Sequence, residues 1–167
     1  NTCAIKVTGE LRCWGVHYNG SDYAAIVVPS DLGSVTSVQT NDYNTCAIKV
    51  TGELRCWGVQ YNGSYYSAIV VPSDLGSVTS VQTNDYNTCA IKVTGELRCW
   101  GVHYTGSGTA AIVVPSNLGS VTSVQTNWAN TCAIKVTGEL RCWGVQYNGS
   151  EHAAIVVPSN LGSVTSV

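Results

Sequence analysis

The stretch Asn1–Val16, NTCAIKVTGELRCWGV, recurs from Asn44, Asn87 and Asn130. The repeat period is therefore 43 residues, with no insertion between copies. The chain divides into repeats 1–43, 44–86, 87–129 and 130–167, and the last lacks its final five residues. Self-similarity at a period of 20 to 50 residues is typical of stacked repeat architectures. We therefore treat residues 1–167 as a single repeat domain.

The quoted stretch predicts a β-hairpin. Its two arms, residues 2–7 and 10–14, are rich in β-branched and aromatic residues and flank Thr8-Gly9. If Gly9 takes the left-handed position of a three-residue loop, Cys3 faces Cys13 across the ladder. A two-residue turn would instead pair Cys3 with Trp14. Only the first register brings two sulfurs together, in a geometry suitable for a disulfide.

The cysteines recur at a fixed spacing of ten, which favours structural disulfides. Zinc sites need closer cysteine pairs, and no Cys-x-x-Cys is present. Disulfides persist in oxidising compartments, so we expect an extracellular or cell-surface protein. The expected pairs join the two cysteines within each repeat: Cys3 and Cys13, Cys46 and Cys56, Cys89 and Cys99, Cys132 and Cys142.

The rest of the repeat predicts further strands. Residues 25–28 indicate a short buried strand ended by Pro29, residues 30–33 a turn, and residues 34–40 another strand. No segment has helical periodicity. Four short strands in about 40 to 45 residues are typical of a propeller blade. We therefore predict an all-β, β-propeller-like array of four repeats, each a small antiparallel sheet with its own disulfide.

The repeats resemble the regulator of chromosome condensation repeat, especially its short secreted forms. The resemblance is carried in every copy by these residues of the first: Cys3-Ala4-Ile5, Gly9, Leu11, Trp14-Gly15, Gly20, Val28-Pro29, Val35 and Val38. It implies a β-propeller, and propellers of this family usually close with seven blades. Four copies cannot fill such a ring, which leaves a four-bladed ring, a longer array or an assembly of several chains.

The chain departs from the family pattern at three positions. Asn41 stands where Gly is usual, Asn1 or Asn44 where His is frequent, and His17 or Gln60 where Asn is usual. Because Asn tolerates left-handed geometry, Asn41 need not break its turn.

Composition excludes several classes of function. The formal charge is −2, only 11% of residues are charged, and the Lys and Arg residues do not cluster. We therefore expect no nucleic-acid partner. No apolar run reaches the length of a membrane span, so we expect none. A surface with so little charge suits a glycosylated protein or one that packs against copies of itself.

No catalytic or metal-binding constellation is apparent. His17, His103 and His152 do not share one repeat position, and no carboxylate pair recurs in the copies. No serine lies in a nucleophile elbow and no glycine loop is suited to phosphate. We expect a protein without enzymatic activity, metal or cofactor.

Three Asn-Gly-Ser segments match the N-glycosylation pattern, at Asn19, Asn62 and Asn148. The third copy has Thr105 instead. The alternative interpretation is that Asn and Gly simply suit a tight turn.

Aromatic residues fall into two groups. Trp14 and its equivalents in each copy are expected to pack one blade against the next. Other aromatic residues lie in segments that differ between copies, and if a binding surface exists we expect it there. The candidate binding loops contain His17, Tyr18, Tyr23, Tyr43, Tyr65, Tyr66 and Trp128.

Two functions fit these features. The first is a structural extracellular protein that assembles end to end with copies of itself as a fibril or scaffold, since residues 163–167 match the strand expected to precede a hairpin like 2–14. The second is a secreted recognition module that binds a protein or carbohydrate through the Tyr-rich loops. Near-identical copies favour the first, because recognition of one partner usually needs distinct loops.

Overall fold

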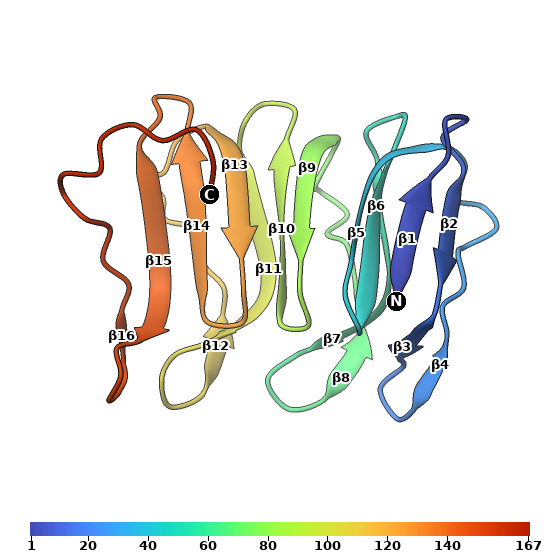
Figure 1. The fold of residues 1–167 in the computed structure, drawn as a ribbon, viewed down its shortest axis with the longest axis horizontal. Helices are drawn as coiled ribbons and strands as arrows, with labels where there is room; N and C mark the ends of the chain where they lie inside the picture. The colour runs from blue at the N-terminus through green and yellow to red at the C-terminus, as the bar shows by residue number, and fades with distance from the viewer.

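The computed structural model describes all 167 residues as an all-β array without helices (Figure 1). The repeats lie side by side, and the axes of their long strands have roughly the same orientation (Figure 1). All paired strands are antiparallel. The strands are β1 (Thr2–Ile5), β2 (Leu11–Trp14), β3 (Val16–Tyr18), β4 (Tyr23–Ala25), β5 (Val35–Thr40), β6 (Asn44–Lys49), β7 (Leu54–Tyr61), β8 (Tyr66–Ala68), β9 (Val78–Thr83), β10 (Asn87–Lys92), β11 (Leu97–Tyr104), β12 (Thr109–Ala111), β13 (Val121–Thr126), β14 (Asn130–Lys135), β15 (Leu140–Tyr147) and β16 (His152–Ala154).

The expected hairpin register is confirmed. In the β1–β2 pair Cys3 lies opposite Cys13, and Ile5 lies opposite Leu11. Gly9 has a φ of 84°, the left-handed conformation that the three-residue loop requires. All four expected disulfides are present, and no cysteine is free. Each repeat is thus covalently closed across its own hairpin.

Each of the three four-stranded sheets crosses a repeat boundary, whereas the two-stranded sheets β1-β2 and β3-β4 lie within the first repeat. β5, at the end of the first repeat, pairs with β6 of the second, and the four-stranded sheet has the order β5-β6-β7-β8. The next two sheets are built in the same way. The expected strand at residues 34–40 is therefore confirmed, and it belongs to the sheet of the following repeat. This exchange links consecutive repeats through backbone hydrogen bonds.

The prediction of a buried strand at residues 25–28 is wrong. β4 ends at Ala25, and the next segment has no partner strand. Ile26 is buried while Val27 is 69% exposed. Residues 26–28 are apolar because this loop covers the core with some of its side chains. Its composition therefore resembles that of a buried strand.

The array is open. The sheets do not close into a ring, and β1 has only β2 as a partner. Residues 163–167, the equivalent of the start of β5, form no strand. Completion of the first blade by this segment within one chain, one of the two expected forms of closure, is thus not observed.

The hydrophobic core lies between neighbouring sheets. One cluster combines Ile48, Leu54 and Val81 with Ala90 of the following repeat, and Trp100 packs against it. Trp57 and Trp143 take the same position at the neighbouring clusters. The prediction that these tryptophans pack one blade against the next is confirmed. Trp14, in the first repeat, is half-exposed and belongs to none of these clusters.

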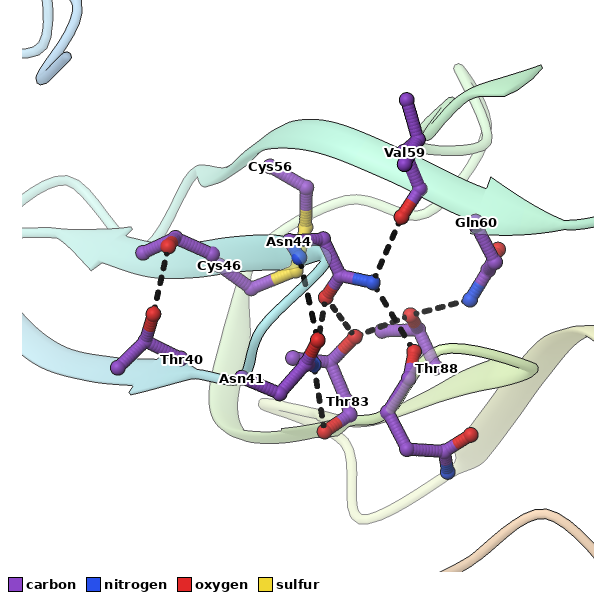
Figure 2. The surroundings of a disulfide bond; sticks show 11 residues. Thr40, Asn41, Asn44, Cys46, Cys56, Val59, Gln60, Thr83 and Thr88 are labelled. Carbon is purple, nitrogen blue, oxygen red and sulfur yellow. Dashed lines mark hydrogen bonds between the residues drawn. A yellow bond between two sulfur atoms is a disulfide. The ribbon is translucent and has the colours of Figure 1, made fainter. Parts of the chain in front are cut away.

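A buried asparagine joins each sheet to the next (Figure 2). The Asn44 side-chain amide donates to the Val59 carbonyl at 3.1 Å and to the Asn84 carbonyl at 3.0 Å. Its oxygen accepts from the Thr83 hydroxyl at 2.7 Å and from the Asn41 amide at 3.0 Å. Asn44 is 1% exposed, so all its hydrogen-bonding capacity is used away from water.

Gly58, opposite Asn44 in the β6–β7 pair, allows the backbone of Tyr43 and Asn44 to approach closely. Gly58, with a φ of 98°, faces the backbone of Tyr43 and Asn44, where an added Cβ would collide with the Tyr43 carbonyl. The Val59 amide donates to that carbonyl at 2.8 Å. The Gly of each Trp-Gly pair is therefore required for close backbone approach.

The asparagine network predicts unequal losses of stability for equivalent residues. Asn87 is fully buried and makes all four bonds, whereas Asn130 is part-buried and makes two. Asn87→Ala should lower the free energy of unfolding by about 3 kcal/mol, and Asn130→Ala should lower it by about 1 kcal/mol. Only the first substitution leaves several buried groups without a hydrogen-bond partner. Denaturant unfolding of the oxidised protein measures both. Equal losses would contradict this account.

The disulfides predict a comparable effect. Cys89 is completely buried, and its bond to Cys99 closes a short loop with a sequence separation of 10. The double substitution Cys89→Ala and Cys99→Ala should lower the free energy of unfolding by about 2 to 3 kcal/mol. Thermal unfolding with and without reductant measures the loss. A variant as stable as the parent protein under oxidising conditions would refute the structural role.

Candidate functional site

The two ends of the sheets differ in chemistry. At one end lie the turns of the disulfide hairpins, such as β6–β7, and at the other lie the β7–β8 hairpin and the β9–β10 turn (Figure 1). The first end carries the repeated Lys, Glu and Arg residues. The second end carries most of the residues that vary between copies and most of the aromatic residues, while the position of Asp31 varies at the first end.

Six tyrosines form one continuous cluster at the second end. Tyr18 contacts Tyr23, Tyr43 and Tyr66, with ring centroids 5.4 to 5.7 Å apart in edge-to-face geometry. Tyr43 and Tyr66 stack with their planes 4° apart. Tyr61 joins Tyr66 to Tyr86.

A second cluster continues along the array. Tyr104 contacts Trp128 at 5.1 Å and His152 at 4.9 Å, and His152 also contacts Tyr147. We call the two clusters together the aromatic row. It consists of Tyr18, Tyr23, Tyr43, Tyr61, Tyr66, Tyr86, Tyr104, Trp128, Tyr147 and His152.

The structure thus brings together five of the seven predicted loop residues: Tyr18, Tyr23, Tyr43, Tyr66 and Trp128. Tyr65 lies at a hairpin tip, 65% exposed and outside these ring contacts. His17 has no ring contact in the row, and its equivalent Gln60 is buried and donates to the Thr88 hydroxyl of the next repeat. The position of His17 therefore belongs to a strand that faces the neighbouring repeat.

Half of the row residues were not predicted from the sequence: Tyr61, Tyr86, Tyr104, Tyr147 and His152. Tyr61, Tyr104 and Tyr147 occupy the same repeat position as Tyr18, and Tyr86 occupies that of Tyr43. In every copy the hydroxyl of the Tyr18 position donates to the carbonyl two residues later. This tyrosine fixes the hairpin turn as well as contributing its ring, and the period alone was a sufficient signal for it.

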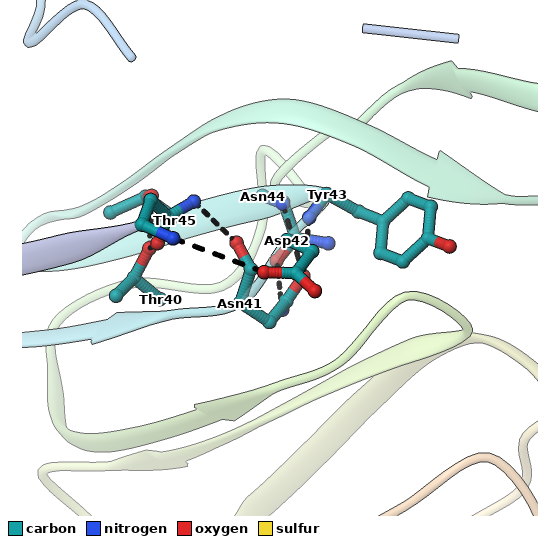
Figure 3. A network of polar contacts seen from close by, with 7 residues as sticks. Thr40, Asn41, Asp42, Tyr43, Asn44 and Thr45 are labelled. Atoms are coloured by element: carbon teal, nitrogen blue, oxygen red, sulfur yellow. Dashed lines mark hydrogen bonds and ion pairs between the residues drawn. The ribbon is translucent and has the colours of Figure 1, made fainter. Parts of the chain in front are cut away.

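An asparagine turn positions Tyr43 (Figure 3). The Asn41 side-chain oxygen accepts from the backbone amides of Tyr43 at 2.8 Å and Asn44 at 3.1 Å. No residue other than glycine has a positive φ, so Asn41 does not adopt left-handed geometry in place of Gly. Its side chain holds the turn instead. The Tyr43 ring points away from this network (Figure 3).

The three glycosylation candidates lie at the tips of the variable hairpins. The Asn19 oxygen accepts from the Ser21 amide at 3.0 Å and from the Asp22 amide at 2.9 Å. Asn62 and Asn148 make equivalent turns. All three side chains are exposed, and their amide nitrogens make no hydrogen bond within the protein. The side-chain oxygens of these asparagines therefore hold the hairpin turns, and the side-chain nitrogens to which a glycan would be attached make no hydrogen bond within the protein.

Asp85 is a half-buried acid beside the row. Its backbone carbonyl accepts from the Tyr61 amide at 2.7 Å, and its carboxylate has no ion pair. Burial raises its pKa above the ordinary value. Burial also raises the pKa of Tyr66 and Tyr86, and the negative charge of Asp85 adds to both shifts.

The opposite end is a repeated framework of charge pairs. Lys49 contacts Glu53 at 2.9 Å, and Arg55 contacts Asp31 of the preceding repeat at 3.4 Å. A groove of about 640 to 690 Å³ recurs in every repeat beside these pairs, lined by invariant residues such as Leu54, Cys56 and Ile69. Burial lowers the pKa of His103.

Nowhere do three or more His, Cys, Asp or Glu side chains gather as metal ligands. The chain also contains no helix with the length and hydropathy needed to cross a membrane.

Comparison with known proteins shows the fold. No family model matches the chain, and no curated protein matches it in sequence. Solved structures do match. Human WBSCR16 is 15% identical with a TM-score of 0.60, over 85% of this chain and 42% of that one. The ectodomain of the Physcomitrella patens receptor kinase CR4 is 19% identical with a TM-score of 0.57, over 85% and 37%.

Prp20p from Saccharomyces cerevisiae, the yeast RCC1, is also similar, with 12% identity and a TM-score of 0.50 over 74% of this chain and 35% of that one. The chain spans less than half the length of each of these proteins. These likenesses, with the sheet topology and the disulfides, show that the chain has a β-propeller-like repeat fold.

Proposed function

We propose that this chain is an extracellular, non-catalytic recognition module that binds its ligand through the aromatic row. The observation that carries the proposal is the gathering of sequence variation and aromatic rings at one end of an otherwise repeated framework. Tyr23, Tyr66, Thr109 and His152 occupy one repeat position, and the row changes accordingly along the array. Loops on a rigid scaffold are where binding residues concentrate.

The physical properties of the row suit recognition. Tyr23, Trp128 and Tyr147 are each more than two-fifths exposed, although their rings also pack against neighbours. Tyr and Trp side chains supply large contact areas with few rotatable bonds, so little conformational entropy is lost when they bind. Ring packing preorganises the surface further.

The four disulfides are consistent with an extracellular location. The CR4 neighbour is a receptor ectodomain, which agrees with this assignment. We also assign the repeats to the regulator of chromosome condensation type, because Cys-Ala-Ile, Gly-x-Leu and Trp-Gly recur at the expected positions and Prp20p shares the fold. Asn19, Asn62 and Asn148 are proposed glycan acceptors, since their side-chain nitrogens face solvent.

Exposed aromatic residues of the row, together with Tyr65 at the hairpin tip beside Tyr66, should carry the binding energy. In the triple variant Tyr23→Ser, Tyr65→Ser and Trp128→Ser, affinity should fall about tenfold or more for the strongest ligand found on glycan and peptide arrays. Surface plasmon resonance with the purified oxidised chain measures the change. The stability should alter little, because all three side chains are largely exposed.

A matched control is available outside the row. Val50, Val93 and Val136 are each 64% exposed and lie in the turns of the disulfide hairpins, at the end away from the aromatic row. Their triple replacement by serine should leave affinity within about twofold. Equal losses in the two triple variants would show that binding is not localised to the row.

End-to-end assembly is a second candidate, favoured by the exposed faces of the end repeats. Leu161 is 42% exposed, whereas its equivalent Leu118 is 2% exposed beneath the following repeat. Trp14 is 55% exposed at the other end, where Trp57, Trp100 and Trp143 are packed. Since the hydrophobic contacts between repeats are made by residues that recur in every copy, these faces match the two halves of one heterologous interface.

Assembly predicts a mass that rises with concentration. Sedimentation velocity of the 167-residue chain should show this rise in the micromolar range, and Trp14→Glu should abolish it by placing a charge in the interface. Val113→Glu, at an exposed site in the middle of the array, should leave it unchanged. A monomeric mass at all concentrations would exclude assembly through these faces.

A further inference from the structure

We propose that the ligand of the aromatic row is a cationic segment of a partner protein, a stretch rich in lysine or arginine, with Asp85 as its charged anchor. This inference rests on the proposed recognition function and specifies its ligand class. It follows from how charge is divided between the two ends of the sheets and from the surroundings of Asp85.

The Lys and Arg residues are confined to the end away from the row. Lys6 and Arg12 flank the turn of the first disulfide hairpin, and the period places the other Lys and Arg residues identically in the later repeats. Most of these side chains pair with a glutamate of the same turn or an aspartate of the preceding repeat, as Lys92 pairs with Glu96 and Arg98 with Asp74. This end is therefore largely neutralised within the protein.

Among its Asp, Glu, Lys and Arg side chains, the row end has only Asp and Glu. Asp22 and Glu151 lie at exposed hairpin turns, and Asp42 and Asp85 lie in the turns after β5 and β9. Only Asp42 has an ionic partner, the terminal ammonium of Asn1 at 3.9 Å. No Lys or Arg compensates the others. The row end thus has a negative potential, which attracts cations and repels phosphates and sulfates.

The surroundings of Asp85 select cations further. Asp85 is half-buried without an ion pair and directly precedes Tyr86 in the chain. Its backbone carbonyl accepts from the amide of Tyr61, whose ring contacts both Tyr66 and Tyr86. Aromatic faces attract ammonium and guanidinium groups, and a nearby carboxylate adds direct Coulomb attraction. A neutral sugar would stack on the rings but would leave the half-buried charge unpaired. The combined site therefore favours a basic side chain over a neutral ligand.

A linear basic segment fits the shape of the row. The two clusters extend along successive repeats, so several side chains of one extended peptide can be bound at once. Each contact is weak alone, and linked contacts add through effective concentration. Association should be fast at low salt and should weaken steeply as salt rises.

The test uses a short fluorescein-labelled peptide of alternating glycine, lysine and arginine and the oxidised 167-residue chain. Fluorescence anisotropy should show binding that weakens with salt. Asp85→Asn should weaken it about fivefold or more. The matched control Asp74→Asn removes an acid that is paired with Arg98 at the other end, and should leave affinity within about twofold.

Unfolding experiments exclude a trivial loss of structure. Because burial raises the pKa of Asp85, its ionised form destabilises the fold at neutral pH, and this cost disappears when the carboxyl group is protonated in acid. Asp85→Asn should therefore be at least as stable as the parent chain at neutral pH while it binds the peptide less well. A loss of stability together with the loss of binding would overturn the anchor role.

Two further probes separate this inference from the proposed function. If neutral oligosaccharides such as chitohexaose bind to the row, and Asp85→Asn leaves that binding intact, the recognition function stands and the cationic ligand is refuted. If an acidic peptide of the same length binds as well as the basic one, charge selection is refuted. If the basic peptide does not bind at low salt, the inference is also refuted. The proposed recognition function is tested separately, by the row variants measured with the ligand found on the arrays.

Discussion

The stacking of this protein depends on a single buried carboxamide at the start of each disulfide hairpin. Asn44 offers two donors and one acceptor oxygen, and the structure satisfies them from both sheets that it joins. An aspartate there could not donate to the two carbonyls, and a leucine would leave several buried groups without partners. Asparagine alone is short enough and bifunctional enough for the position. The network therefore fixes the position of each sheet relative to the next one.

That alignment positions the aromatic row. Asn41 lies in the turn directly before Asn44, and its amide reaches Asn44 while its oxygen holds the turn from which Tyr43 projects. The framework contact and the placement of a row residue thus share one set of hydrogen bonds. Since the same turn recurs in each repeat, rings from successive repeats are brought within contact distance. The row is a consequence of the repeat spacing.

Local pattern and turn geometry were enough to predict the hairpins, because only one register lets Cys3 face Cys13. The same reasoning failed at residues 25–28, where Ile26 is buried from a loop and composition does not distinguish a loop from a strand. The roles of Asn41 and Asn44 were also missed. Their partners lie in another repeat, and no local pattern specifies how two sheets stack. The row was half predicted, since variability identified Tyr23 and Trp128 but not the invariant Tyr61.

The division between invariant and variable positions has a physical basis. A substitution at Asn44, Gly58 or Trp100 would be repeated at every junction if the copies stay alike, and each junction would lose stability. A substitution at the position shared by Tyr23, Tyr66, Thr109 and His152 changes only a partly exposed end of one blade. The framework can therefore keep its sequence while the row diversifies. Nearly identical repeats, which initially argued against specific recognition, thus carry a surface that differs from repeat to repeat.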